Sequence, residues 1–257
     1  MTGIYVFDQR RAHGRHRHLS AAHDPLTRAR LAETGVGDGW HCLDVGAGDG
    51  EIARWLADRV APSGSVLATD VRPNPRSRPP VVEHDVVTDP LSEEAFDLVV
   101  ARLVLRHLPE REAVLAKLVS ALKPGGWLQI DEFDTSYEPL LLAGDAESAL
   151  LYEKFLAAKA TAMRAAGVGT DWGRQVPLAM HLAGLVEIDP HPQVQLRHPG
   201  SPDLLLLVQS TVDMHAELVS AGMTAGELDQ VREIVRHPDF RATSCLMYSV
   251  HGRKPAR

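Results

Sequence analysis

A chain of 257 residues, 44% of them hydrophobic, can bury a full core as one large domain. Its net charge of −7 and pI near 6.0 argue against nucleic acid as a partner, because no basic field would attract a phosphate backbone. Its two cysteines, Cys42 and Cys245, give no disulfide framework or metal-ligand spacing, and no apolar stretch is long enough to cross a membrane. We expect a soluble cytoplasmic protein, a monomer or homodimer, that binds no membrane.

Strands and helices alternate between residues 40 and 134. Apolar runs predict strands at 41–45, 65–69, 81–87, 96–101 and 127–130. Apolar residues at helical spacing predict helices at 52–60 and from Pro109 to Leu122. The prolines of VRPNPRSRPP prevent a regular helix between the second and third strands. The alternation predicts an α/β fold with a mainly parallel sheet covered by helices on both faces.

The second half of the chain is richer in helices. We expect helices at 144–166, 174–183, 203–219 and 224–235, and a closing strand at 242–251. Thr224 and Glu227 stand at capping-box spacing at the start of the last helix. We predict a single domain with four parts: a helical N-terminal lid (1–39), a cofactor-binding core (40–134), a helical cap insertion (135–183) and the C-terminal part of the sheet with its helices (184–257).

The stretch LDVGAGDG predicts a ligand-binding turn between a strand and a helix, because glycines let a ligand approach the helix N-terminus closely. Its glycine spacing, GxGxG, lacks the third glycine of the dinucleotide fingerprint, and Asp44 would repel a pyrophosphate. Both features disfavour an NAD-dependent enzyme. Asp70 ends the second strand where a carboxylate can bind ribose hydroxyls, and Asp85 follows the third strand, placed to accept from an adenine amine. A nucleoside carrying a cation instead of phosphates describes S-adenosylmethionine.

Five segments stand in the order and at about the spacing of the class I S-adenosylmethionine-dependent methyltransferases: LDVGAGDG, VLATD, EHDVV, FDLVVARLVLRHLP and LKPGGWLQIDEFD. The chain resembles that family, and the stretches YVFDQ…HDPLTRARL and GTDWGRQVP look like its actinobacterial natural-product members. The resemblance implies a Rossmann-like fold with a seven-stranded sheet and S-adenosylmethionine as cofactor. It implies cofactor contacts at the glycine turn, the ribose, the adenine and the floor beneath the sulfonium, from Asp44, Gly46, Ala47, Gly48, Gly50, Asp70, Val71, Asp85, Val86, Ala101, Arg102 and Leu103.

Several classes of methyl acceptor are excluded by the sequence. ARLVLRHLP lacks the Asn/Asp-Pro-Pro-aromatic motif of enzymes that methylate base amines, and neither cysteine follows a proline as a pyrimidine-attacking nucleophile would. Ala101 and Arg102 stand where magnesium-dependent catechol enzymes place an aspartate, so we predict no metal. We expect in-line methyl transfer to a small organic acceptor, in secondary metabolism. The alternative is a protein that senses S-adenosylmethionine without turnover, which requires an acceptor pocket closed by side chains.

The acceptor should bind over the carboxyl ends of the strands. Our candidate catalytic residues are His107, Glu132 and Tyr5. An imidazole titrates in a suitable range, but His107 also fits a purely structural role, and Glu132 could instead fix the N-terminal segment. Tyr5 would belong to a lid that closes over the sulfonium. The candidate substrate-binding residues are Phe7, Phe133, Trp172, Arg174, Met214 and Met247.

Overall fold

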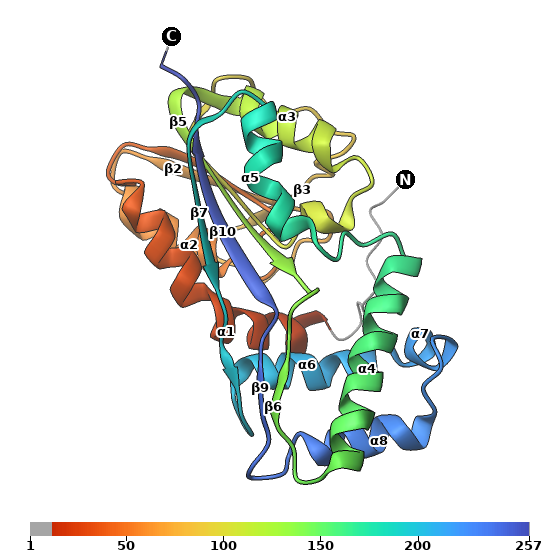
Figure 1. The fold of residues 1–257 in the computed structure, drawn as a ribbon. Helices are drawn as coiled ribbons and strands as arrows, with labels where there is room; N and C mark the ends of the chain where they lie inside the picture. The colour runs from red at the N-terminus through yellow and green to blue at the C-terminus, as the bar shows by residue number, and fades with distance from the viewer. Residues whose placement is uncertain (1–11, 257) are drawn as a thin grey trace.

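The computed structural model describes residues 12–256. Its centre is a seven-stranded sheet in the order β3-β2-β1-β4-β5-β10-β7 (Figure 1). The first five strands are parallel, and β10 lies antiparallel between β5 and β7. The predicted Rossmann-like fold with a mainly parallel sheet is therefore confirmed. The strands are β1 (His41–Val45), β2 (Ser65–Asp70), β3 (Val81–Glu83), β4 (Phe96–Arg102), β5 (Leu122–Asp134), β7 (Val186–Gln193) and β10 (Leu246–Arg253).

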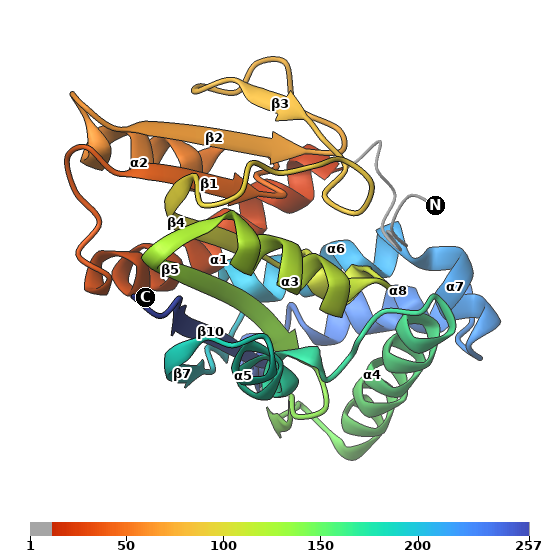
Figure 2. The ribbon, with the colours of Figure 1, turned by 90° about the horizontal axis from the view of Figure 1, so that it is seen from above.

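Helices cover both faces of this sheet (Figures 1 and 2). On one face, Leu31 of α1 (Ala12–Glu33) and Leu56 of α2 (Glu51–Val60) pack in one hydrophobic cluster with Leu98 of β4. On the other, Leu115 of α3 (Arg111–Ala121) and residues of α5 (Trp172–Leu182) pack with Val99, the next residue of β4. Successive side chains of a strand point to opposite faces of the sheet. One apolar strand therefore packs against the helices on both faces.

Four further helices form a separate layer beside the carboxyl end of β5 (Figure 2). They are α4 (Ala146–Ala165), α6 (Pro202–Asp213), α7 (His215–Ser220) and α8 (Ala225–Ile234), and we call them the cap. The cap has its own hydrophobic cluster, in which the Tyr152 ring lies 5.1 Å from that of Phe240 and 6.3 Å from that of Phe155. A small sheet of β6 (Leu140–Leu142), β9 (Arg241–Thr243) and β8 (Leu196–Arg197) lies beside it.

The cap does not have the predicted boundaries, 135–183. Helix α5 lies within that range but packs on β5 and β10 as a sheet-covering helix. The helices α6, α7 and α8, which lie beyond residue 183, complete the cap instead. An apolar helix face predicts that a helix is packed, but it does not say against which layer.

Most predicted elements are present, and the differences have local causes. The predicted strand 81–87 ends at Glu83, because the Asp85 carboxylate accepts the Val87 N–H at 2.9 Å and closes a turn. The predicted helix 203–219 is broken at Met214 into α6 and α7. The capping box of α8 is confirmed. Within residues 12–256, no helix has the length and apolarity that crossing a bilayer requires.

The C-terminal strands differ more from the prediction. The expected strand 242–251 is interrupted at Ser244 and Cys245, so that β9 joins the small sheet and β10 the large one. Strand β7 was not predicted, since Pro190 and Pro192 disfavour strand pairing. They are tolerated because β7 is an edge strand, hydrogen-bonded to β10 alone in the described sheet.

Candidate cofactor and acceptor site

The turn between β1 and α2 is built from glycines in left-handed conformations. The φ angle is +67° at Gly46, +56° at Gly48 and +82° at Gly50, values that residues with a Cβ rarely adopt. A Cβ placed on Gly46 would lie 2.3 Å from Cγ2 of Val104, and one placed on Gly48 would lie 3.4 Å from the ring of His16. The predicted glycine turn is therefore present, and its backbone is left bare at the helix N-terminus.

Two carboxylates flank this turn. Asp44, at the end of β1, is buried, and its Oδ2 has no hydrogen-bond partner in the described structure. Burial raises the pKa of Asp44 to about 7, while the nearby Arg102 guanidinium opposes the rise. The Asp70 carboxylate accepts the Gly48 N–H at 3.0 Å and the Arg72 N–H at 2.9 Å. A buried carboxylate oxygen without a partner is a position that a cationic or N–H-bearing ligand group would satisfy.

The remaining residues expected around the nucleoside are distributed unevenly. Ala47 lies within the glycine turn, and Val71 follows β2 with 47% of its surface exposed. Asp85 already uses one carboxylate oxygen in its own turn. Val86 packs in the hydrophobic core beneath α3, so that only its backbone is available to a ligand. Cofactor contacts of these four residues stay predictions.

The end of β4 differs from expectation at one residue. Ala101 is fully buried in the sheet, and Leu103 follows with φ +55° and lines the cavity described below. Arg102, expected in the floor beneath the sulfonium, instead donates from Nη1 to Asp24 Oδ1 at 2.7 Å and Thr27 Oγ1 at 3.3 Å. The guanidinium is therefore held by α1.

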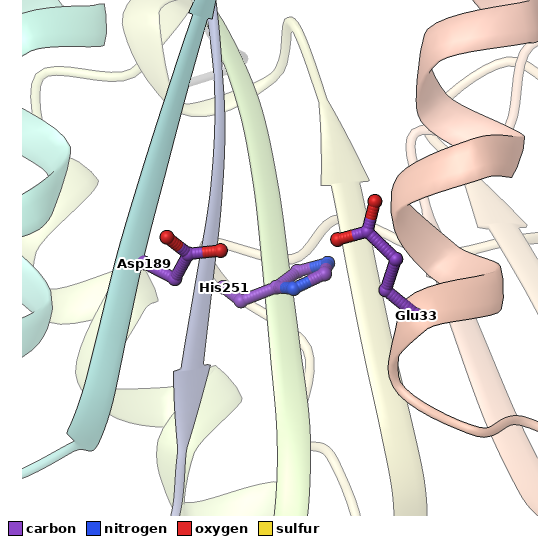
Figure 3. A group of neighbouring side chains, drawn as sticks. All are labelled: Glu33, Asp189 and His251. Carbon is purple, nitrogen blue, oxygen red and sulfur yellow. The ribbon is translucent and has the colours of Figure 1, made fainter.

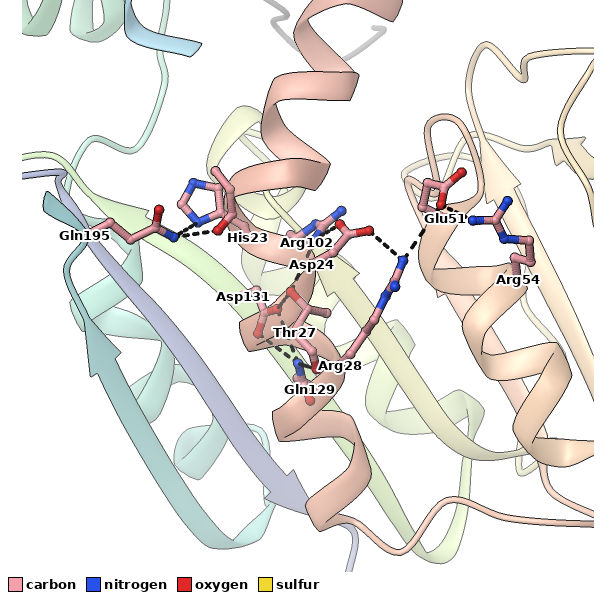
Figure 4. Close-up of polar contacts among 11 residues, drawn as sticks. His23, Asp24, Thr27, Arg28, Glu51, Arg54, Arg102, Gln129, Asp131 and Gln195 are labelled. Carbon is pink, nitrogen blue, oxygen red and sulfur yellow. Dashed lines mark hydrogen bonds and ion pairs between the residues drawn. The ribbon is translucent and has the colours of Figure 1, made fainter. Parts of the chain in front are cut away.

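Helix α1 is fixed to the sheet largely through polar contacts (Figure 4). Thr27 Oγ1 donates to Asp131 Oδ2 at 2.6 Å, and Gln129 Nε2 donates to the Thr27 carbonyl at 3.2 Å. Arg28 extends this chain of contacts, donating to Asp24 Oδ2 at 2.9 Å. Buried hydrogen bonds of this kind fix the position of α1, because breaking them would leave polar atoms unpaired.

Of the N-terminal lid expected over residues 1–39, the structure describes residues 12–39. The anchored part of α1 forms a wall of the fold. The first described turns of α1 carry Arg15, which lines the cavity and donates to Ser210 Oγ of the cap at 3.1 Å. Tyr5 and Phe7 lie outside the described residues, so their roles stay predictions.

A cavity of about 60 Å³ lies between the end of β5, the cap and the short helix η2 (Leu105–His107). Its apolar wall includes Leu103, Phe133, Met163 and Leu207. Its polar wall is unusually rich in charge, with Arg15, Arg106, Lys159, Arg197 and Asp203. We call this space the acceptor cavity.

The two described catalytic candidates occupy different positions. His107 lines the acceptor cavity. Glu132 lies behind it, with no exposed surface; its Oε1 accepts the Arg106 N–H at 3.1 Å and its Oε2 has no hydrogen-bond partner in the described structure. Burial raises the pKa of Glu132 to about 7, opposed by the charge of Arg106. Glu132 thus holds η2 in place, whereas its alternative role toward the N-terminal segment involves residues outside the described range and stays a prediction.

The substrate-binding candidates separate into two groups. Phe133 lines the acceptor cavity, and Met247 packs against it. Trp172 and Met214 are instead buried in the sheet core and the cap core, where their apolar surface is satisfied by packing. Arg174 is half exposed outside the cavity and pairs with Asp171 at 2.9 Å. None of these three residues lines the acceptor cavity, and their contacts with a substrate stay predictions.

A buried ion network beside the cavity was missed from the sequence. Lys159 Nζ lies 2.7 Å and Arg197 Nη1 3.0 Å from the two carboxylate oxygens of Glu138, and Asp203 accepts from Arg197 Nε at 2.5 Å. Burial acts to raise the pKa of Glu138, but Lys159 and Arg197 together hold it below its ordinary value. The available signal was Lys159 itself, a lysine amid the small and apolar residues of α4.

One group of residues has the composition of a metal site, Glu33, Asp189 and His251 (Figure 3). However, Arg30 Nη2 lies 2.7 Å from Asp189 Oδ2 and 3.2 Å from His251 Nδ1, and Arg30 Nη1 pairs with Glu33. Burial, and then the charge of Arg30, lowers the pKa of His251 to about 4. The Arg30 guanidinium takes the place that a metal ion would occupy, and the cluster connects α1 to β7 and β10.

Comparisons with known proteins point to one family. A family model described as a methyltransferase domain matches residues 43–130. Methyltransferase str2 of Strobilurus tenacellus is 36% identical over 124 residues, which cover 45% of this chain and 45% of that protein. The ubiquinone/menaquinone biosynthesis C-methyltransferase UbiE of Cupriavidus taiwanensis is 33% identical over 129 residues, 46% of this chain and 53% of the relative. The chain thus spans about half the length of these curated relatives.

A solved structure shows the same fold over a longer range. The phosphoethanolamine N-methyltransferase 2 of Haemonchus contortus, in complex with phosphomonomethylethanolamine and S-adenosylhomocysteine, superposes on 90% of this chain and 52% of its own. The TM-score is 0.52 and the sequence identity 16%. The family match over 43–130 coincides with the glycine turn and the first five strands of the observed sheet. In sheet order, in the glycine turn and over residues 43–130, the chain is similar to the class I S-adenosylmethionine-dependent methyltransferases.

Proposed function

We propose that this protein transfers a methyl group from S-adenosylmethionine to a small organic acceptor, without a metal ion. The observation that supports this most directly is that the glycine turn and the acceptor cavity meet at one place. Val104, which packs over Gly46, directly precedes η2, whose residues Arg106 and His107 line the cavity. The cofactor, when bound, supplies a methyl group already activated by the positive sulfur, so that alignment of the acceptor is the protein's main task.

The residues around the turn fit this cofactor. Asp44 and the backbone from Gly46 to Gly50 would hold the methionine part, since a bare backbone and a buried unpartnered carboxylate oxygen suit a ligand with a cationic group. Asp70 would hold the ribose and Asp85 the adenine, as the family resemblance implies. The complex of the Haemonchus contortus enzyme with S-adenosylhomocysteine supports the same choice of cofactor.

On the acceptor side, His107 is the residue that would remove a proton, because it lines the cavity. Glu132 would act through η2 as a positioning residue, since it accepts the Arg106 N–H. The apolar wall around Phe133 would exclude water from the reacting atoms. Metal independence is supported by Arg102, a cation that occupies the end of β4 and is bonded to α1.

The acceptor class is proposed from the curated relatives and from the sequence resemblance. UbiE is named for quinone biosynthesis, which is consistent with a small organic acceptor but belongs to primary metabolism. We propose secondary metabolism from the resemblance to natural-product methyltransferases, and a cytoplasmic monomer or homodimer. The sensor alternative requires a cavity closed by side chains, whereas this one holds about 60 Å³ of space.

The proposal is tested in two steps. Calorimetry with S-adenosylhomocysteine and with NAD should show binding of the first only. Incubation with methyl-labelled S-adenosylmethionine and a small-molecule extract of the source strain should then give a labelled product, and His107→Ala should lower kcat with little change in cofactor affinity. Cofactor binding without any labelled product, over the full extract, would favour the sensor.

A further inference from the structure

Arg106 is a buried cation for which two guanidinium nitrogens find no hydrogen-bond partner among the described residues. Its side chain is 2% exposed, and its Nε and Nη2 atoms have no hydrogen-bond partner in the described structure. A guanidinium removed from water without hydrogen bonds destabilises a protein, and such groups are normally paired. A side chain kept in this state beside a cavity indicates that a ligand completes its hydrogen bonds.

The other buried charges around the cavity do not need such a ligand. Lys159 and Arg197 are paired with Glu138 and Asp203, so that two positive and two negative charges balance within the network. His23 lies 3.3 Å from Asp203 and adds a further contact on the acidic side. Arg106 belongs to no ion pair within the described residues, and it therefore leaves the cavity wall with surplus positive charge.

Glu132 is the nearest candidate for an internal partner of Arg106, but it does not serve as one here. Its contact with Arg106 is to the backbone N–H, at 3.1 Å, and no side-chain ion pair forms between the two. Burial also raises the pKa of Glu132 to about 7, so its carboxyl group is not a full counter-charge near neutral pH. Coulomb attraction from Arg106 limits that rise without satisfying the guanidinium N–H groups.

The geometry of the free atoms specifies what would bind. Nε–H and Nη2–H lie on the same edge of a guanidinium and point in parallel, which is the arrangement that binds both oxygens of a carboxylate. The Arg106 guanidinium lies 5.6 Å from the centre of the Phe133 ring, which helps to fix it. Leu103, Met163 and Leu207 form apolar surface on the same cavity.

We infer that the acceptor is a carboxylic acid with an apolar body, and that Arg106, whose Nε and Nη2 are buried at the cavity wall, turns its guanidinium into the cavity to bind the acceptor's carboxylate through these two atoms. The inference rests on the proposed function, because it assigns a ligand to the same cavity. His107, the next residue of η2, then faces the body of the bound acid from the same short helix. Arg106 is thus a specificity-determining residue, one that selects acids over their neutral analogues.

The test compares acids with neutral analogues of the same shape. Benzoate with benzamide, and propionate with propionamide, are titrated into the full chain at pH 6, below the pKa of Glu132, and at matched ionic strength, with and without S-adenosylhomocysteine. We expect at least one acid to bind about tenfold or more tightly than its amide, a difference of about 1.4 kcal/mol. Equal affinities within both pairs would overturn the inference.

Variants connect the preference to Arg106. Arg106→Gln should abolish the preference for the acid, and Arg106→Lys, which keeps the charge but not the paired N–H groups, should reduce it. Arg174→Gln is the matched control, because Arg174 lies outside the cavity. The melting temperature of ligand-free Arg106→Gln should not fall, since an unpaired buried charge is removed. A lower melting temperature with an unchanged preference would make Arg106 a structural residue.

The two proposals fail in distinguishable ways. If the wild-type protein does not bind S-adenosylhomocysteine, the methyltransferase proposal is contradicted. A preference for acids measured in the absence of S-adenosylhomocysteine would still support the carboxylate site. Normal binding of S-adenosylhomocysteine, together with equal affinities for acid and amide, would leave the methyltransferase proposal intact and reject the acid acceptor.

Discussion

The glycine turn and the acceptor cavity lie side by side but are made differently. The turn consists of backbone from one stretch of chain, Gly46 to Gly50, with Asp44 just before it. The cavity wall combines side chains from α1, η2, β5, α4, β8 and α6. Arg15 and Arg197, which are 182 residues apart in sequence (197 − 15), line the same cavity. A site made of backbone is contained in one short segment, whereas a site made of distant side chains depends on the whole fold.

The two regions also differ in how charge is treated. At the turn, Asp44 is a single buried acid with one unpartnered oxygen. Beside the cavity, Glu138, Lys159, Arg197 and Asp203 neutralise one another where the cap meets the small sheet. The first arrangement leaves a charge available for a ligand, and the second uses charge to fix the walls. Arg106 is the exception that brings ligand-binding character to the second region.

The largest expected effect comes from removing one acid of the buried ion network beside the cavity. Glu138→Gln leaves Lys159 and Arg197 with one fewer counter-charge, so we expect a loss of roughly 3–5 kcal/mol in the free energy of unfolding. For a chain of this size, that corresponds to a fall of about 6–20 °C in melting temperature. Glu233→Gln, at an exposed pair with Arg236, should cost less than about 1 kcal/mol. A Glu138→Gln protein as stable as this control would show that the network is not required.

The second prediction concerns Glu132, the buried acid behind the cavity, and the dependence of stability on pH. Burial raises the pKa of Glu132 from 4.5 to about 7, so the folded state disfavours its ionised form and this residue's contribution to stability is lost as pH rises between those values. Glu132→Gln removes that titration. The stability of the variant relative to wild type should therefore increase by up to about 3 kcal/mol from pH 4.5 to pH 8. Denaturant unfolding at several pH values measures it.

The control for this series is Glu112→Gln, a change at an exposed carboxylate on α3. Its stability relative to wild type should stay flat over the same pH range. A flat profile for Glu132→Gln as well would mean that Glu132 is ionised throughout, in contradiction to its burial.

A methyl group added to the turn tests whether backbone alone makes the first site. Gly46→Ala adds strain of about 1–2 kcal/mol at a left-handed residue, as well as an overlap with Val104. We expect the affinity for S-adenosylhomocysteine to fall about a hundredfold, or 2.7 kcal/mol by calorimetry. Gly125→Ala is the matched control, because its φ is +80° but nothing lies within 4 Å of the added carbon. Equal losses in both variants would point to general destabilisation.

Removing the acid at the end of β2 should have a smaller effect. Asp70→Ala removes the carboxylate assigned to the ribose, and each charge-assisted hydrogen bond contributes roughly 1.5–3 kcal/mol. We expect at least about tenfold weaker cofactor binding in a folded protein, with Asp58→Ala, an exposed acid of α2, as the unaffected comparison. Unchanged calorimetric affinity in the folded Asp70 variant would remove this residue from the site.

Removal of metal ions is expected to have no effect on turnover. If methyl transfer is metal-independent, exhaustive treatment with EDTA should leave the turnover rate unchanged, because Arg102 occupies the end of β4 where a metal-binding acid would stand. Restoration of a lost rate by magnesium would contradict this prediction and would direct attention to the acids at the end of β5.

The sequence by itself determined the features that depend on neighbours along the chain. Alternating apolar segments gave the parallel sheet, Gly46 to Gly50 gave the turn, and Thr224 with Glu227 gave the start of α8. Each follows from local steric and hydrogen-bonding rules that operate within a few residues. The same locality explains why the sequence could not show that Trp172 and Met214 pack in hydrophobic clusters, since an apolar residue fits a core as well as a ligand pocket.

Only the tertiary structure decided the composition of the cavity. Arg106 stands beside His107 in the sequence, yet nothing in that segment shows that its guanidinium is buried without a partner. Lys159 acquires its role only when β8 and α6 bring Arg197 and Asp203 beside α4. Burial and pairing depend on contacts between residues far apart in sequence, and these contacts set the free energy of a charged group. The chain therefore shows its cofactor turn in sequence, and its acceptor site only once it is folded.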